Sequence, residues 1–144
     1  MSNNIKVKIK KLDPRGVIPS YAKPGDACMD LTAISEKVVE ENGFGYIEYG
    51  TGLAFEYPED HVLQIFPRSS ISDTGLILSN SVGIIDEFRG EIKVRFKWVK
   101  GSNKYNVGDR VGQFMIIPRP IMELEEVEEL SETERGQGGW GSTN

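Results

Sequence analysis

The sequence contains few of the residues on which metal sites and covalent catalysis usually depend. Its 144 residues include one cysteine, Cys28, and one histidine, His61. A lone cysteine excludes an intramolecular disulfide, so we expect a reducing compartment. One cysteine and one histidine are also too few for a zinc site of the usual kind. The composition therefore favours neither a zinc enzyme nor a covalent mechanism.

Long hydrophobic runs and an excess of positive charge are missing as well. No apolar run reaches the roughly eighteen residues of a membrane-spanning helix, and the opening stretch MSNNIKVKIKKL lacks the apolar segment of a secretory signal. The net charge is −5, whereas general nucleic-acid binders need a basic surface. We expect a cytoplasmic protein, or an intracellular one in a virus-infected host, that binds neither membrane nor nucleic acid. A nucleotide substrate stays possible, because a triphosphate needs only a local basic pocket.

Strand patterns dominate what is present. Apolar and polar residues alternate in 5–9 and in 91–99, which predicts strands with one buried face. Short apolar runs at 61–66 and 111–117 are typical of strands that are buried on both faces. Because turn sequences separate many short strands, we predict an all-β fold, a jelly-roll-like distorted barrel with one short helix.

Two segments have some helical tendency. Residues 69–73 are expected to form one or two helical turns, with Ser69 or Ser70 as the N-cap, and segment 121–130 suits either a helix or a strand. The residues after 130 carry too few apolar side chains to pack a core. We therefore expect one β domain over residues 1–130 and a flexible, glycine-rich tail over residues 131–144.

An arginine and two serines mark the expected start of the short helix, in PRSSIS (67–72). Backbone N–H groups at a helix N-terminus are unsatisfied donors, and together with hydroxyl groups and a guanidinium they form an anion site. The same pattern is common in a simple helix cap. Alone, it is a weak indication of ligand binding.

One aspartate stands out in the stretch SNSVGIIDEFRGEI (79–92). Asp86 follows two isoleucines and precedes a tight turn. A carboxylate at the end of a buried strand is held firmly, as a general base must be. The alternative is an aspartate that serves only the turn, which is the commoner role of an isolated Asp.

The tail contains the unusual sequence RGQGGWGST (135–143). Its glycines allow the backbone to approach a ligand closely. Arg135 offers a planar fork for phosphate, and Trp140 offers a face for a base. The alternative is a solubilising tail, although such tails rarely keep a lone tryptophan between glycines.

Five stretches together resemble the trimeric dUTPase family. In order they are PGDACMDL (24–31), PRSSIS (67–72), NSVGIIDEFRGEI (80–92), GDRVGQ (108–113) and RGQGGWGST (135–143). Each is a weak signal alone. Five motifs in the family's order and at suitable separations, spanning nearly the whole chain, are a strong one.

The resemblance implies an enzyme that hydrolyses dUTP to dUMP and pyrophosphate, which keeps uracil out of DNA and supplies dUMP for dTMP synthesis. It also implies a homotrimer with three shared active sites, in which the tail of one chain closes over a pocket between the other two. The implied cofactor is Mg²⁺, held by the triphosphate without direct protein ligands, with Asp30 near its water shell.

The resemblance further implies a role for each site residue, with Asp86 as the general base for water attack on the α-phosphorus. The nucleoside would be bound by Asn80, by the main chain of Ile84, Ile85 and Lys93, and by Phe88 against the deoxyribose. The phosphates would be bound by Arg68, Ser69, Ser70 and Gln113. The tail would contribute Arg135 at the γ-phosphate, Trp140 stacked on uracil, and substrate contacts from Gly138, Gly141 and Ser142.

The chain departs from the family pattern in several places. Cys28 and Met29 stand where the family usually has Gly-Tyr, and Trp140 replaces the usual phenylalanine. Only Glu87 separates Asp86 from the following aromatic, usually a tyrosine, where the family has two residues. A one-residue change in a hairpin can turn a side chain to the other face, which affects above all the sugar-packing role of Phe88.

Two other functions are compatible with the same scaffold. A dCTP deaminase shares the fold, but it usually lacks a tail of this kind. A regulatory or binding trimer would have no need of catalytic residues, whereas this chain keeps its phosphate ligands and Asp86. Hydrolysis of dUTP is therefore the predicted function.

Overall fold

Strands make up nearly all the regular structure in residues 4–141, the part of the chain that the computed structural model describes. The strands are β1 (Lys8–Lys11), β2 (Met29–Thr32), β3 (Ser35–Glu41), β4 (Phe44–Gly50), β5 (Leu53–Glu56), β6 (His61–Phe66), β7 (Leu76–Leu78), β8 (Gly83–Ile85), β9 (Lys93–Trp98) and β10 (Arg110–Pro118). A short 3₁₀ helix, η1 (Ser69–Asp73), lies between β6 and β7. The predicted all-β class with one short helix is confirmed.

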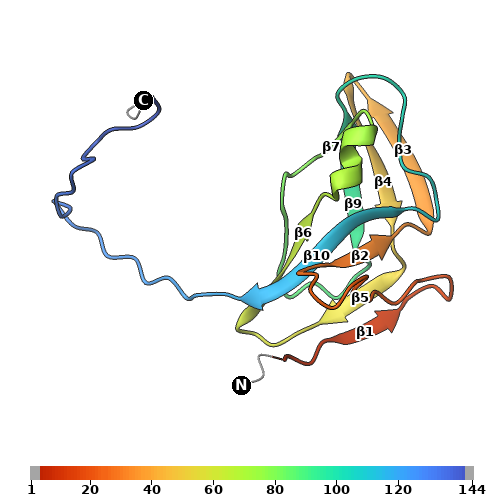
Figure 1. Cartoon of the computed structure of the whole chain (residues 1–144), viewed down its shortest axis with the longest axis horizontal. Coiled ribbons are helices and arrows are strands. Elements are labelled where there is room, and N and C mark those ends of the chain that lie inside the picture. Colours follow the sequence, from red (N-terminus) through yellow and green to blue (C-terminus); the bar gives the residue numbers. More distant parts are fainter. Residues whose placement is uncertain (1–3, 142–144) are drawn as a thin grey trace.

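The strands pair into three antiparallel sheets, in the orders β1-β5, β2-β10-β6-β8 and β3-β4-β9-β7 (Figure 1). Within residues 4–141 the outer strands of each sheet pair on one side only. The sheets therefore pack against one another without closing into a barrel. The jelly-roll-like layering of antiparallel sheets is as predicted, whereas the barrel is not formed.

The core lies between the sheets and follows the alternation of the sequence. In β9, Val94 and Phe96 are buried while Lys93, Arg95 and Lys97 are exposed. Side chains that are almost completely inaccessible come from several strands and their connections, among them Leu31, Ile47, Tyr49, Leu53, Leu63, Ile92 and Val111. Each such apolar side chain contributes about 1.5–3 kcal/mol on burial.

Strands β6 and β10 are buried less evenly than predicted. Each has one face on the core, but Gln64 and Met115, which are Cα partners across the two strands, are only half-buried. Ile84 of the neighbouring strand β8 pairs with Gln64 and is 53% exposed. The expectation of two buried faces is thus wrong for a single chain, because nothing within the described residues covers this outer face completely.

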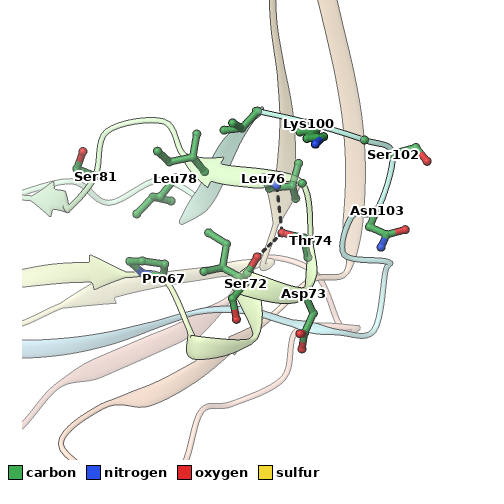
Figure 2. Close-up of a pocket in the computed structure, with 15 residues that line it drawn as sticks. Pro67, Ser72, Asp73, Thr74, Leu76, Leu78, Ser81, Lys100, Ser102 and Asn103 are labelled. Atoms are coloured by element: carbon green, nitrogen blue, oxygen red, sulfur yellow. Dashed lines mark hydrogen bonds between the residues drawn. The ribbon is translucent and has the colours of Figure 1, made fainter.

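Helix η1 has a different cap from the one predicted. Arg68 is the N-cap residue, with extended backbone and no side-chain capping bond, so Ser69 and Ser70 are not caps but lie inside the helix. At the other end, Thr74 Oγ1 donates to Ile71 O at 2.7 Å and accepts from Leu76 N at 3.1 Å (Figure 2). These two bonds end the helix and start β7.

The chain leaves the sheets after β10. Arg119 is still attached to the body, since its N–H donates to Asp60 O at 2.8 Å and its Nε donates to Glu59 O at 2.8 Å. Segment 121–130 forms neither the helix nor the strand that its sequence suggested, and its apolar side chains are exposed. It extends away from the body (Figure 1).

No helix in the described part of the chain is long and apolar enough to cross a membrane.

Candidate functional site

Sheet pairing brings together residues from three of the five motifs. Gln113 of β10 is the Cα partner of Asp30 in β2 on one side and of Phe66, the last residue of β6, on the other. The chain that leaves β6 at Pro67 therefore passes close to both. Gln113 Nε2 donates to Pro67 O at 3.0 Å, which fixes the start of the segment that carries Arg68.

Arg68 is the centre of this group. Its Nε donates to Asp30 Oδ1 at 2.8 Å, and its Nη1 donates to Ser70 Oγ at 3.2 Å. Arg110 Nη1 lies 3.6 Å from the other oxygen of Asp30. We call Asp30, Arg68, Ser70, Arg110 and Gln113 the Arg68 cluster.

The Arg68 cluster has donors left over for an anion. Within residues 4–141, Nη2 of Arg68 has no hydrogen-bond partner. The neighbouring Ser69 is exposed, and only its carbonyl is engaged, by Ser72 Oγ at 2.8 Å. A guanidinium edge next to a free hydroxyl suits phosphate oxygens, because charge-assisted hydrogen bonds are the stronger kind.

Asp86 lies elsewhere on the same sheet. Strand β8 runs antiparallel to β6, with Gly83 opposite Ile65 and Ile85 opposite Leu63. Asp86 follows Ile85 and so lies toward the start of β6, whereas Arg68 follows its end. Between Leu63 and Pro67 the chain advances about 13 Å, at about 3.3 Å per residue. Within one chain the structure does not bring Asp86 and the Arg68 cluster together.

The surroundings of Asp86 leave its carboxylate accessible. It lines a hollow of about 800 Å³ together with Tyr57, His61, Gln64 and Arg89, among others. Its side chain has no hydrogen bond or ion pair among the described residues. The main chain before it is anchored, since Tyr57 Oη donates to Ile85 O. Burial raises the pKa of Tyr57, so this hydroxyl stays protonated as a donor.

The turn after Asp86 is tight. Glu87 has φ 37°, a left-handed conformation that is uncommon for a residue with a side chain. The half-exposed Phe88 ring folds over Gly90, where an added Cβ would lie 2.6 Å from the ring. In the single chain, the Phe88 ring of this shortened hairpin thus packs on Gly90 of the same turn.

The other residues predicted to bind the nucleoside flank this turn. Asn80 is exposed, and its carbonyl accepts from Val82 N at 2.6 Å. Ile84 and Ile85 belong to β8, whereas Lys93 begins β9 in a different sheet, with its Nζ 3.7 Å from Glu48 Oε1. The structure therefore places these residues on two sheets joined by the Asp86 turn.

The described part of the tail makes only local contacts. Arg135 Nε donates to Gly138 O at 2.5 Å, and Gly138 N donates to Arg135 O at 3.1 Å. Gly141 has φ 78°, which glycine adopts without strain, and Trp140 is fully exposed. Ser142 lies outside the described residues. Among residues 4–141, no hydrogen bond or ion pair joins the tail to Asp86 or to the Arg68 cluster.

A hollow of about 870 Å³ lies between η1, β7 and the loop that follows β9 (Figure 2). Its lining includes Ile71, Leu76, Leu78, Lys100 and Asn103. None of the predicted site residues in the described part of the chain lines it. Its size alone therefore gives no reason to place the chemistry there.

Two side chains in contact with the predicted site were not singled out from the sequence. Arg110 stands inside the motif GDRVGQ, so its position was a usable signal. Tyr105 gave no signal, because its hydroxyl reaches Ser70 Oγ, at 3.0 Å, only in the folded chain. Cys28 takes no part: burial, assisted by the charge of Asp30, raises the pKa of its thiol and disfavours the reactive thiolate.

The family model for dUTPase matches residues 15–144. The deoxyuridine 5'-triphosphate nucleotidohydrolase of Alkaliphilus metalliredigens is 41% identical over 140 residues, covering 95% of this chain and 96% of that relative. The protein of the same name from Nautilia profundicola is 41% identical over 144 residues, covering 96% and 99%.

Solved structures show the same fold. The Staphylococcus bacteriophage 80alpha dUTPase with dUPNHPP has a TM-score of 0.81 at 24% identity and covers 99% of both chains. A dUTPase from phage phi11 of S. aureus, described with a structural Mg(II) ion, has a TM-score of 0.72 at 23% identity and covers 88% of this chain and 99% of its own. The family match over nearly the whole length and the identity to these relatives establish that the chain belongs to the dUTPase family.

Proposed function

We propose that this chain is a dUTP diphosphatase, which hydrolyses dUTP to dUMP and pyrophosphate. Relatives whose names state this activity match at least 95% of the chain. The observation that carries the proposal is the division of the site. One end of β6 presents an anion-binding guanidinium, and the other end presents an accessible carboxylate.

The Arg68 cluster binds the triphosphate. Asp30 and Ser70 hold the guanidinium of Arg68 so that Nη2 is left for a phosphate oxygen. Ser69 offers a hydroxyl beside it, and Gln113 supports the backbone at Pro67. Phosphoryl chemistry depends mainly on such positioning and charge neutralisation.

Asp86 supplies the base. Its accessible carboxylate takes a proton from a water molecule as the water oxygen bonds to the α-phosphorus. The bond from the α-phosphorus to the bridging oxygen breaks, and pyrophosphate leaves with the electron pair. Asn80, Ile84, Ile85, Phe88 and Lys93 bind the deoxyuridine beside the base.

The active sites are shared between the chains of a homotrimer. Within one chain, Asp86 lies beside the start of β6 and Arg68 follows its end, so we propose that the two halves of a site come from different copies. Exposed Ile84 on the outer face of the sheet, and the exposed apolar side chains of segment 121–130, supply surface for such an assembly.

Residues 131–144 act as a tail that closes over a neighbouring site. To reach the γ-phosphate, Arg135 exchanges its bond to Gly138 O for one to substrate. Trp140 then stacks on uracil, and Gly138, Gly141 and Ser142 bring the backbone close to the nucleotide. Residues 1–130 form the domain on which the tail docks.

Magnesium fits this site through the substrate. Within residues 4–141 there is no group of three or more His, Cys, Asp or Glu side chains that could hold a metal, and both oxygens of Asp30 already meet arginines. Magnesium prefers phosphate oxygens and keeps several waters, and we propose that Asp30 would lie next to that water shell. When bound, the ion neutralises charge on the phosphates.

We place the enzyme in the cytoplasm, or inside a virus-infected host cell, without membrane or nucleic-acid partners.

Release of pyrophosphate tests the proposed activity. The purified protein with Mg²⁺ is incubated separately with dUTP, UTP, dCTP and dTTP, and pyrophosphate and ammonia are both measured. We expect pyrophosphate from dUTP alone. Ammonia from dCTP would identify a deaminase, and no reaction with any of the four would leave a binding protein on the dUTPase scaffold.

A further inference from the structure

We propose that Tyr105 is a positioning residue, which fixes the orientation of the Arg68 guanidinium through the hydroxyl of Ser70. The inference rests on the proposed function, because it assumes that Arg68 binds the triphosphate. It assigns a role to a buried side chain outside the five motifs.

The aromatic core holds Tyr105 in place. Its side chain is 6% exposed, and its ring packs edge-on against Tyr49, with centroids 6.2 Å apart, and at a tilt against Phe96, with centroids 5.8 Å apart. Tyr49 Oη also donates to the carbonyl of Tyr105 at 2.7 Å. Contacts on both the ring and the backbone leave the tyrosine hydroxyl one position.

That hydroxyl meets the Arg68 cluster at Ser70. Tyr105 Oη lies 3.0 Å from Ser70 Oγ, and Ser70 Oγ accepts from Arg68 Nη1 at 3.2 Å. A serine hydroxyl has two lone pairs and one proton, so it can bond both partners at once. Ser70 thus connects a guanidinium that is 28% exposed to the fixed core.

The consequence for Arg68 is a fixed plane. Asp30 binds Nε and Ser70 binds Nη1, which also lies 3.5 Å from the carbonyl oxygen of Arg110, so hydrogen bonds at two different edges set the guanidinium. Without the tyrosine hydroxyl, Ser70 Oγ is free to turn between its staggered rotamers. Arg68 then keeps Asp30 and the longer bond to Arg110 O but loses the shorter bond at Nη1, and Nη2 is held less firmly toward the triphosphate.

Tyr105→Phe removes the hydroxyl and keeps the packed ring. We expect Kd for a slowly hydrolysed dUTP analogue with Mg²⁺ to rise about five- to tenfold, the loss of one hydrogen bond to a charged network. Competitive inhibition by deoxyuridine, which has no phosphate, should be unchanged. Ser70→Ala should raise the Kd for the analogue at least as much. The double variant with Tyr105→Phe should have the same Kd as Ser70→Ala alone.

Tyr46→Phe is the matched control. Tyr46 lies half-buried in β4, and its hydroxyl has no hydrogen bond among the described residues, so both affinities should stay at the wild-type value. The inference is overturned if Tyr105→Phe binds the analogue as tightly as the wild type, or if it lowers the affinity for deoxyuridine by the same factor. It is also overturned if the loss of affinity caused by Tyr105→Phe is as large in the Ser70→Ala background as in the wild type. A wild-type protein that does not bind the analogue refutes the proposed function instead.

Discussion

Three acidic side chains near the sheets differ in what binds them. Asp30 is paired with Arg68 and Arg110, and Glu48 is paired with Arg95 at 2.7 Å and with Lys93 at 3.7 Å. Asp86 has no such partner among the described residues. Carboxylate oxygens that already accept from arginine are occupied, whereas those of Asp86 are open to a water molecule, which supports our proposal that Asp86 is the base.

Asp86→Asn tests the base directly. Asparagine keeps the size of the side chain but does not take the proton, so we expect kcat to fall on the order of 10²-fold or more. Affinity for a slowly hydrolysed dUTP analogue should change little. Glu87→Gln, which removes one negative charge from the adjacent exposed residue, is the control and should keep its activity. Near-normal turnover of Asp86→Asn would place the base elsewhere.

The position of Asp86 beside the residues that we propose to bind the nucleoside also predicts which phosphorus is attacked. Hydrolysis in ¹⁸O-water should place the label in dUMP and leave pyrophosphate unlabelled, because the water bonds to the α-phosphorus. Mass spectrometry of both products measures this. Label in pyrophosphate would contradict the assignment of Asp86, since attack would then occur at the β-phosphorus.

Among the elements, those with local signals were predictable. The alternation in 91–99 correctly predicted β9 and its buried face, and the turn-and-serine pattern at 69–73 correctly located η1. The helix cap was wrong because Ser70 bonds to Arg68 and Tyr105, a contact that depends on tertiary structure. Burial of both faces of β6 and β10 was wrong because apolar composition does not show whether the cover comes from the same chain.

The tail element shows the same limit. Its glycines and Trp140 indicated a ligand-binding role, yet in the single chain Trp140 is exposed and, among the described residues, Arg135 bonds only to its own turn. The apolar side chains of 121–130 are likewise exposed, since nothing in residues 4–141 buries them. We propose that another molecule completes these patterns, which a single chain cannot show.

Fluorescence of Trp140 tests tail closure. The exposed indole should emit at long wavelength without ligand, and the emission should change markedly when a slowly hydrolysed dUTP analogue and Mg²⁺ bind. Stacking on a base is worth roughly 1–3 kcal/mol. Trp98→Phe removes the background from the half-buried tryptophan of β9.

Two variants and a second ligand complete this experiment. Trp140→Phe keeps a stacking face and should retain more activity than Trp140→Ala. The matching UTP analogue should change the emission little. An emission that ignores the dUTP analogue, together with full activity of Trp140→Ala, would mean that the tail does not cover the base.

For the whole molecule, the decisive feature is the separation of Asp86 from the Arg68 cluster along β6. The motifs supplied the predicted site residues, because each motif is continuous in the sequence. The sequence does not show which of these residues lie together in space, because sheet pairing joins three motifs at Arg68 and leaves Asp86 apart. Tyr105 was missed for the same reason, since it meets the site through Ser70, a contact across the fold.

Subunit complementation tests the shared sites most directly. Asp86→Asn and Arg68→Ala should each be inactive alone. If each site takes Asp86 from one chain and Arg68 from another, random trimers from equal amounts should have both residues intact in about one site in four. Refolding the two variants together should therefore restore dUTP hydrolysis to roughly that fraction of the wild-type rate. A mixture of Asp86→Asn with the double variant should stay inactive. Mixed trimers that mass spectrometry detects but that release no pyrophosphate from dUTP would contradict the account.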